Sequence, residues 1–304
     1  MGSKSKIEWT EASWNMISGC TKISSGCKNC YAERMATRFG RDFSKVVCDE
    51  SKLDQPTHWK RPRKIFVCST ADLFHADVPF SFISKVFDIM EANPRHTFQI
   101  LTKRADRMAE WFELRSAIHD YNNGPEVMLP NVWVGVTTEN QEMADLRIPF
   151  LFRCPAEIRF VSVEPMIGSV DLNRFMSGEM GNKLDWVIIG GESGQNARPC
   201  HPMWVRNLVN NCRLFNTPIM FKQWGEWGPA EELSDESRSE WVNSEKETKS
   251  LLMMSDGSFK ETSFGVRVPF EPAWATPGMA LMLKLGKHKT GRFIDDYEYL
   301  EYPK

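Results

Sequence analysis

Short apolar runs recur along most of the chain, and a longer amphipathic segment usually follows each run. The runs are rich in Val, Ile and Phe and carry few polar residues, which is typical of strands buried on both faces of a parallel sheet. Their starts lie about 27 to 34 residues apart, which is the length of one strand, one helix and two loops. The predicted strands are Lys64–Cys68, Thr97–Leu101, Asn131–Val136, Ile158–Val163, Asp185–Ile189 and Pro218–Lys222.

Helical periodicity fills the intervals between these strands. The predicted helices are Phe80–Ala92, Arg104–Ala117, Gln141–Leu151 and Met203–Phe215. Strands that alternate with helices predict an α/β fold with a parallel sheet. Six or seven such units favour a partial TIM-type barrel, with an open doubly wound sheet as the alternative.

The N-terminal part predicts one more unit. Trp14–Ser18 is a short predicted strand that leads into a loop with three cysteines, and Asn29–Arg38 is a predicted helix with Asn29 as its N-cap. Residues 41–64 show little periodicity and are expected to form a long connection.

The periodicity divides the chain into three predicted parts. Residues 1–227 form the barrel, including the cysteine loop at residues 19–31. Residues 228–263 lose the pattern and are rich in Glu, Ser and Asp, which predicts a polar insertion or lid. Residues 264–304 regain apolar content and are expected to pack on the barrel as a C-terminal extension.

Composition narrows the class of protein. The 304 residues are 41% hydrophobic and 26% charged, with a formal net charge of −2, which argues against a protein that coats nucleic acid. Because the sequence has no apolar run of about eighteen residues and no leader pattern, we expect a cytoplasmic protein with no membrane span. In such a chain the eight cysteines are predicted to be thiols or metal ligands rather than disulfides.

The cysteine loop is the strongest chemical signal. Cys20, Cys27 and Cys30 lie within eleven residues, and Gly19 and Gly26 allow the chain to bend between them. Iron–sulfur clusters and structural zinc sites normally have four protein ligands, so three cysteines indicate a cluster with one open iron or a zinc site completed by a distant ligand. The spacing alone leaves both alternatives open.

A polar cluster follows each predicted strand. The carboxyl ends of parallel barrel strands lie at one mouth, where active sites are built, and the cysteine loop belongs to the same mouth. Taken singly, each cluster is compatible with an ordinary capped turn. The clusters are Ser69–Asp72, Thr102–Arg104, Thr137–Asn140, Glu164–Pro165, Gly190–Gly194 and Gln223–Trp227.

A set of motifs extends over nearly the whole chain. The motifs are Ile7–Thr10, Trp14–Asn15, Gly19–Glu33, Asp72–His75, Leu101–Arg104, Gly135–Val136, Glu139–Asn140, Ser162–Pro165, Gly190–Ser193, Ala197–Pro199 and Phe221–Trp227. Together they resemble the phage Gp37/Gp68 family, which is similar to the radical S-adenosylmethionine (SAM) superfamily. The resemblance implies a partial barrel that holds a [4Fe–4S] cluster on Cys20, Cys27 and Cys30, with SAM on the open iron. The common superfamily spacing has three residues between the first two cysteines, whereas six separate Cys20 from Cys27 here.

Positions at the strand ends then suggest roles in this implied site. Tyr31 is expected near the adenine, with core packing as the alternative, and Ser69 and Asp72 are candidates for the methionine end of SAM. The candidates for the SAM ribose and carboxylate are Thr138, Glu139, Asn140 and Glu164, and those for adenine or substrate are Gly190, Gly191 and Glu192. Lys103, Arg104 and Lys222 are candidates for binding an anionic group.

The leading hypothesis is a radical SAM enzyme. A flavodoxin- or ferredoxin-type donor would reduce the cluster, and reductive cleavage of SAM would produce a 5′-deoxyadenosyl radical that abstracts hydrogen from a substrate. The expected substrate is a nucleotide or nucleic-acid base, as in phage-type DNA hypermodification or lesion repair. This expectation rests on the family resemblance, on eleven tryptophans, which are able to stack on bases, and on three basic clusters. The clusters lie within Lys60–Lys64, Lys103–Arg107 and Lys284–Arg292.

Two other classes compete. A zinc-stabilised nucleic-acid or protein-binding module would use the three cysteines and a fourth ligand such as His75 or His201. A metal-dependent hydrolase is disfavoured because the six histidines show no paired ligand spacing.

Overall fold

The computed structural model describes residues 5, 7–121, 128–179, 181–242, 249–261 and 277–304. The chain divides into two compact units. The first comprises Met1–Thr137, Asp145–Ser162 and Gly178–Asp185, and the second comprises Thr138–Ala144, Val163–Ser177 and Trp186–Lys304.

Within the described residues, the main sheet has seven strands in the order β1-β4-β5-β6-β7-β8-β9. This order follows the chain, so each crossover steps in the same direction, whereas a doubly wound sheet reverses direction at a switch point. Right-handed crossovers that all step one way place their helices on one face, as in a barrel. The predicted α/β partial barrel is confirmed. The strands are β1 (Ala12–Trp14), β4 (Lys64–Val67), β5 (Thr97–Thr102), β6 (Val132–Thr137), β7 (Ile158–Val163), β8 (Trp186–Gly190) and β9 (Ile219–Gln223).

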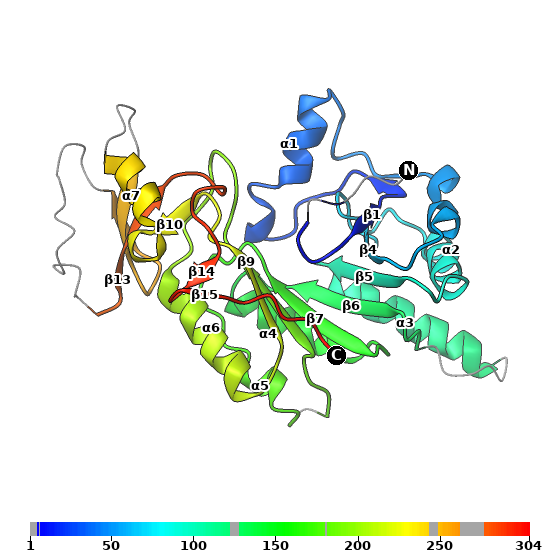
Figure 1. Ribbon diagram of the computed structural model, residues 1–304. Helices are drawn as coiled ribbons and strands as arrows, with labels where there is room; N and C mark the ends of the chain where they lie inside the picture. The colour runs from blue at the N-terminus through cyan, green and yellow to red at the C-terminus, as the bar shows by residue number, and fades with distance from the viewer. Residues whose placement is uncertain (1–4, 6, 122–127, 180, 243–248, 262–276) are drawn as a thin grey trace. The chain divides into compact units, whose positions relative to one another are not determined.

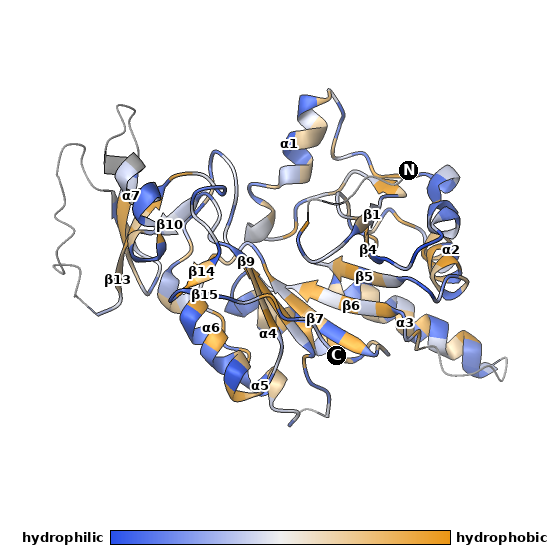
Figure 2. Ribbon diagram, in the orientation of Figure 1, coloured by the Kyte–Doolittle hydropathy of each residue, from blue (hydrophilic) through white to orange (hydrophobic). Residues whose placement is uncertain are grey.

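The first unit contains the parallel pairs that support the cysteine loop. β1 pairs with β4, β4 with β5, β5 with β6, and β6 with β7. The helices α2 (Phe80–Glu91) and α3 (Ala105–Tyr121), which Figure 1 shows to the right of β5 and β6, bury only apolar and alanine side chains. The third helix between these strands is α4 (Gln141–Phe152). Figure 2 shows the resulting concentration of hydrophobic residues on the strands.

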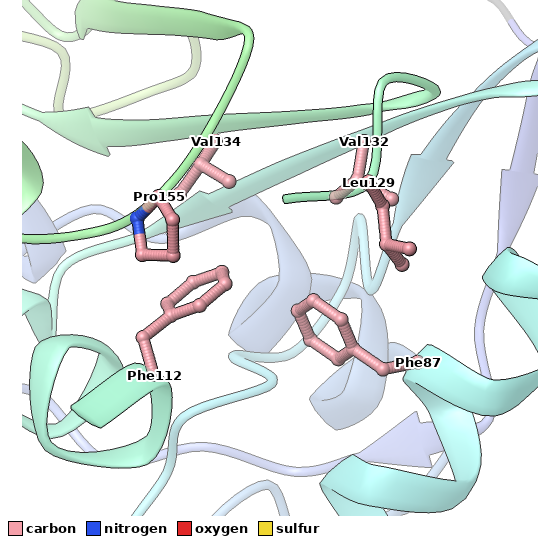
Figure 3. A pocket seen from close by; sticks show the side chains of 6 residues that line it. All are labelled: Phe87, Phe112, Leu129, Val132, Val134 and Pro155. Atoms are coloured by element: carbon pink, nitrogen blue, oxygen red, sulfur yellow. The ribbon is translucent and has the colours of Figure 1, made fainter. Parts of the chain in front are cut away.

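A pocket in this unit is part of the apolar core (Figure 3). Phe87 of α2 and Phe112 of α3 line it together with Val132 and Val134 of β6. Leu129 and Pro155 complete the lining. Because none of these side chains is polar or ionisable, the pocket offers packing surface and no catalytic group.

The chain around the cysteine loop departs from the predicted elements. The predicted strand Trp14–Ser18 is divided between β1 and β2 (Ile17–Ser18), and β2 pairs with β3 (Val47–Cys48) inside the predicted long connection. The helix α1 (Tyr31–Arg38) has Cys30 as its N-cap. The prediction of Asn29 as the cap was wrong because the chain remains non-helical through Cys30, at φ −56° and ψ 123°. The remaining short helices here are η1 (Ser25–Cys27), η2 (Glu50–Lys52) and η3 (Gln55–His58).

The other predicted elements agree with the structure to within a few residues, and local chemistry explains two shifts. The α6 helix (Pro202–Leu214) begins at Pro202, since a proline in the first turn loses no helical hydrogen bond. The side chain of His201 caps it by accepting a hydrogen bond from the Met203 N–H. The β8 strand begins after Asp185, whose carboxylate accepts a hydrogen bond from the Arg159 N–H.

The second unit also contains a four-stranded antiparallel sheet in the order β10-β13-β11-β12. Buried and partly exposed residues alternate along β11, which is the two-residue period of a strand. The polar composition of residues 228–263 made this period hard to recognise in the sequence. The elements after β9 are β10 (Trp227–Pro229), η4 (Ala230–Glu232), α7 (Asp235–Val242), β11 (Ser250–Met254), β12 (Phe259–Glu261), β13 (Met279–Lys284), β14 (Phe293–Ile294) and β15 (Tyr297–Glu298), and the short helix α5 (Asn173–Met176) precedes β8.

The predicted lid and C-terminal extension lie partly outside the described residues, at 243–248 and 262–276. The described parts of both share the antiparallel sheet. Leu281 and Leu283 of β13 pack with Leu233 and Ala230 in a separate apolar cluster. The proposed domain boundaries and the lid role remain predictions.

Candidate active site

The three cysteines follow the first strand of the sheet. Cys20 lies just after β2, Cys27 ends η1 and Cys30 precedes α1, and all three are half-buried free thiols. Gly19 lets the chain turn sharply at the start of the cysteine loop. It adopts φ +87°, and a Cβ there would lie 2.1 Å from the Lys45 carbonyl oxygen. The loop therefore requires glycine at this position.

The donor set consists of three free thiols on one loop. Thiolates are the usual ligands of iron–sulfur clusters, and they also bind zinc. Within the described ranges, no group of three or more His, Cys, Asp or Glu side chains is already arranged to hold one metal ion.

His75, the proposed fourth zinc ligand, is occupied by protein contacts. Its Nδ1 accepts a hydrogen bond from the Asp77 N–H at 3.1 Å. The proton is then on Nε2, which donates to Thr21 Oγ1 at 2.8 Å. With both ring nitrogens engaged, His75 has no lone pair directed towards the cysteines.

A buried ion pair supports Cys20 from the next two strand ends. Arg104, which follows β5, donates from Nη1 to the Asp72 carboxylate at 2.9 Å and to Cys20 Sγ at 3.6 Å. Its Nη2 donates to the Thr21 carbonyl oxygen at 3.0 Å. Thr102 donates to the other Asp72 oxygen at 2.7 Å. Arg104 and Asp72 are 9% and 6% exposed, so this pair is part of the interior.

These neighbours have opposing effects on the Cys20 thiol. Burial raises its pKa, and the Asp72 carboxylate raises it further, whereas the Arg104 guanidinium lowers it. A thiolate ligand must be deprotonated. Arg104 therefore supplies the positive charge and the N–H donor that favour the ligating form.

Tyr31 and Ser69 tie the loop to the end of β4. The Tyr31 hydroxyl donates to the Ser69 carbonyl oxygen, and the Ser69 hydroxyl donates to Asn15 Oδ1 at 3.1 Å. Tyr31 is 48% exposed, so the alternative that it packs in the core was wrong. Lys103 is half-buried, and its backbone N–H donates to Asp72. The structure thus brings Tyr31 to Ser69, and Lys103 and Arg104 to Asp72, and Arg104 also contacts Cys20.

The second unit holds a separate polar cluster. Glu164 follows β7, and its Oε1 accepts a hydrogen bond from Lys222 Nζ at 2.8 Å. The two side chains are 21% and 19% exposed. A Cβ at Gly190 would lie 2.9 Å from the Glu164 carboxyl carbon, and one at Gly191 would lie 1.8 Å from the Trp224 carbonyl oxygen. Close approach of backbone and side chains explains both glycines.

Glu192 is held by a residue that did not figure among the expected site residues. Its carboxylate receives three hydrogen bonds from Arg198, through the backbone N–H, Nε and Nη2. Glu192 is 5% exposed, so this bidentate pair is largely withdrawn from water. The motif Ala197–Pro199 contains Arg198, but a single arginine gave no signal of its partner.

Thr138, Glu139 and Asn140 follow β6 and belong to the same unit, where the Glu139 carbonyl oxygen accepts a hydrogen bond from the Ile167 N–H at 2.9 Å. Asn140 Oδ1 accepts a hydrogen bond from the Met143 N–H at 3.0 Å, which caps the start of α4. Thr138 and Glu139 are fully buried. In the described residues, Thr138 Oγ1 is a buried hydroxyl oxygen with no hydrogen-bond partner.

Four other cysteines lie in the interior. Cys68, Cys154, Cys200 and Cys212 are all buried free thiols. Burial raises the pKa of Cys154 and of Cys212 to about 12. These thiols are inert compared with the half-exposed loop cysteines.

Across the described ranges, no helix combines the length and apolarity needed to cross a bilayer.

Fold and site together define an α/β partial-barrel protein with a three-thiol loop after its first strand. The chain belongs to the family described as Protein of unknown function (DUF5131), whose model matches residues 4–303. No curated protein matches the sequence.

Two solved structures show weak similarity in fold. A single-substitution mutant of spore photoproduct lyase aligns over 74% of this chain and 79% of that chain, with 10% identity and a TM-score of 0.49. Spore photoproduct lyase complexed with dinucleoside spore photoproduct aligns over 69% of this chain and 63% of that chain, with 12% identity and a TM-score of 0.44.

Proposed function

We propose that this protein is a radical SAM enzyme in which Cys20, Cys27 and Cys30 hold a [4Fe–4S] cluster. The observation that carries the proposal is the set of three half-exposed thiols on one loop, beside a histidine whose two nitrogens are already engaged. Such a set leaves one iron open for SAM. When bound, the cluster supplies the electron for reductive cleavage of SAM, which initiates hydrogen abstraction from a substrate.

The chain's own residues would bind and orient SAM. In the first unit, Tyr31 is proposed to meet the adenine, and Ser69 and Asp72 the methionine end. In the second unit, Gly190 and Gly191 lack side chains and allow close approach to the backbone. The remaining proposed contacts to SAM are Thr138, Glu139, Asn140 and Glu192.

Three charged residues are proposed to serve substrate chemistry, and a fourth is proposed to position the cysteine loop. Glu164 and Lys222 form a partly exposed pair that is able to bind a polar group or to exchange a proton with it. Lys103 is half-buried beside Asp72. Arg104 is committed to Asp72, Cys20 and Thr21, so we assign it a positioning role in holding the loop.

We further propose a nucleotide or nucleic-acid substrate and a cytoplasmic, reducing setting. The substrate proposal rests on the phage association of the Gp37/Gp68 family, on the basic clusters and on the eleven tryptophans. Lys60 and Arg61 are exposed and precede β4, whereas the cysteine loop follows β1. Basic residues there would contact a phosphate backbone away from the reacting base.

Anaerobic reconstitution with iron and sulfide, followed by electron paramagnetic resonance (EPR) of the reduced protein, tests the proposal. We expect a four-iron signal that changes when SAM is added and is lost in Cys27→Ala. The matched control is Cys48→Ala, which removes a half-buried thiol outside the loop and should keep the signal. A protein that binds one zinc and shows no response to SAM would refute the radical mechanism and support the binding module.

A further inference from the structure

The chain between β8 and α6 is a loop without helix or strand. Two of its residues close it into a ring, because Arg198 donates hydrogen bonds from its backbone N–H, Nε and Nη2 to the Glu192 carboxylate. Within the ring, the Ala197 N–H donates to the Gly194 carbonyl oxygen at 3.0 Å. We call residues 192–198 the β8 loop.

Two neighbouring strands of the antiparallel sheet bond to this loop. In the register of β10 and β13, Trp227 pairs with Lys284. Trp227 Nε1 donates to the Ala197 carbonyl oxygen at 2.8 Å, and Lys284 Nζ donates to the Gln195 carbonyl oxygen. The Lys284 ammonium lies 5.7 Å from the centre of the Trp227 ring, a distance at which a cation and an aromatic ring attract each other.

Glu226, which precedes β10, makes two further bonds to the loop. Its Oε2 accepts a hydrogen bond from the Gly194 N–H at 3.0 Å. Its own backbone N–H donates to the Glu192 carbonyl oxygen at 2.8 Å. The sheet and the residue before it thus bond to the loop at Glu192, Gly194, Gln195 and Ala197.

These contacts are largely withdrawn from water. Trp227 and Ala197 are each 7% exposed, and Glu192 is 5% exposed. A buried carbonyl oxygen that loses its donor cannot replace it readily with water, so each bond of this kind is costly to break. The sheet is therefore able to hold the loop in one conformation.

We propose that Glu226, Trp227 and Lys284 are positioning residues, which hold the β8 loop in the conformation that binds SAM. The inference rests on the proposed function, in which Glu192 and the two glycines before it lie against SAM. A loop that is ordered in advance loses less entropy when its ligand binds, so fixing it increases affinity. The three residues act through the loop and need no contact with SAM.

Hydrogen–deuterium exchange of the loop amides tests this clamp on the full chain without any cofactor. The Gly194, Ala197 and Arg198 N–H groups are all hydrogen-bonded in the loop. Trp227→Phe keeps an aromatic ring but removes the donor to Ala197. We expect the exchange of these three amides to become at least about fivefold faster, because opening of the loop becomes easier.

Trp204→Phe is the matched control. Its indole N–H donates to the Ser255 carbonyl oxygen at 2.6 Å, and Trp204 is 4% exposed. The variant therefore loses the same kind of buried bond in the same unit, outside the β8 loop. It should leave the exchange of the loop amides unchanged.

Equilibrium dialysis of labelled SAM against the reconstituted, unreduced protein measures the consequence for binding. In Glu226→Ala/Trp227→Phe, we expect the dissociation constant of SAM to rise about tenfold. The iron content should not change, since the three cysteines belong to the other unit. Glu226→Gln keeps an acceptor for the Gly194 N–H and should bind SAM as the parent does.

The other outcomes overturn the inference in distinguishable ways. Unchanged loop exchange in Trp227→Phe would show that the sheet does not hold the loop. Faster exchange with an unchanged SAM affinity would show that the loop is held but is not part of the SAM site. An equal loss of SAM affinity in Trp204→Phe would assign the effect to general stability. A protein that binds neither cluster nor SAM would refute the proposed function, and the positioning role with it.

Discussion

The polar groups at the strand ends of the two units differ in what surrounds them. Around the cysteine loop, Asp72 and Arg104 are at most 9% exposed and bond to each other, and Arg104 also donates hydrogen bonds to Cys20 and Thr21 of the loop. In the second unit, Glu164 and Lys222 are about one-fifth exposed and pair with each other. Two ion pairs of similar length therefore serve different purposes.

Burial is the physical reason for the difference. A buried pair is costly to separate, so it holds neighbouring groups in one geometry. A pair in contact with water exchanges partners at little cost, so it is available to a ligand. The comparison teaches that a polar strand end becomes a scaffold or a binding group according to its solvent exposure.

Breaking the buried pair should have the largest effect. Arg104→Met leaves the Asp72 carboxylate buried without its cation and removes the donor to Cys20, so we expect a loss of about 3–5 kcal/mol in the free energy of unfolding. Iron retention should fall with it. Urea unfolding and iron analysis measure both quantities.

Arg104→Lys is the matched control for this prediction. It keeps the charge but loses the planar fork that reaches Asp72, Cys20 and Thr21 together, so it should recover part of the stability and less of the iron retention. Equal iron contents in parent, Lys and Met variants would contradict a positioning role for Arg104.

Gly191→Ala should rank next, in the second unit. Its Cβ would lie 1.8 Å from the Trp224 carbonyl oxygen, so backbone must move, at a cost of about 3 kcal/mol. Gly168→Ala is the control, since its nearest contact would be 3.4 Å from Asn140 Cβ. Thermal unfolding compares the two variants, and equal melting temperatures would show that the Gly191 backbone is free to shift.

Acidification should weaken both units through buried histidines. His96 of the first unit and His201 of the second are each 1% exposed, and burial lowers the pKa of each below the usual 6.5. Below pH 6.5 these histidines are protonated in the unfolded chain but stay neutral in the folded protein. The unfolded state therefore binds more protons, and the free energy of unfolding falls as pH falls. Each histidine contributes at most about 1.4 kcal/mol per pH unit, down to its folded pKa.

Urea unfolding at pH 7.5 and pH 5.5 checks this expectation. His96→Gln and His201→Gln should each reduce the difference in the free energy of unfolding between pH 7.5 and pH 5.5, because each variant removes the contribution of one histidine. A difference that stays the same in both variants would assign the pH dependence to other groups.

Breaking the partly exposed Glu164–Lys222 pair should have the smallest effect on the free energy of unfolding. Lys222→Met is expected to cost about 1 kcal/mol or less in the free energy of unfolding, while cleavage of SAM falls about tenfold if the pair faces substrate. Arg292→Met is the control, because it breaks the exposed Arg292–Glu298 pair of the same unit and should leave cleavage unchanged. Unchanged cleavage in Lys222→Met would remove this pair from the proposed site.

The repeat of strand and helix was predictable because each element is specified locally. β7 occupies the predicted residues Ile158–Val163, and α2 ends one residue before the predicted Ala92. Burial on both faces makes each strand an apolar run, and the crossover helices keep a 3.6-residue period. Cap positions were less predictable, as Cys30 shows, because they depend on where the preceding loop is held.

The sequence by itself determined the order of strands and helices, the polar strand ends and the three cysteines with glycine beside them. These features are encoded in residue type and spacing, which need no knowledge of distant contacts. Only the tertiary structure decided that Arg104 contacts Cys20 across 84 residues, that His75 is occupied by Thr21 and Asp77, and that Arg198 neutralises Glu192. Such pairings depend on which strand ends become neighbours, and on the burial that makes them persist.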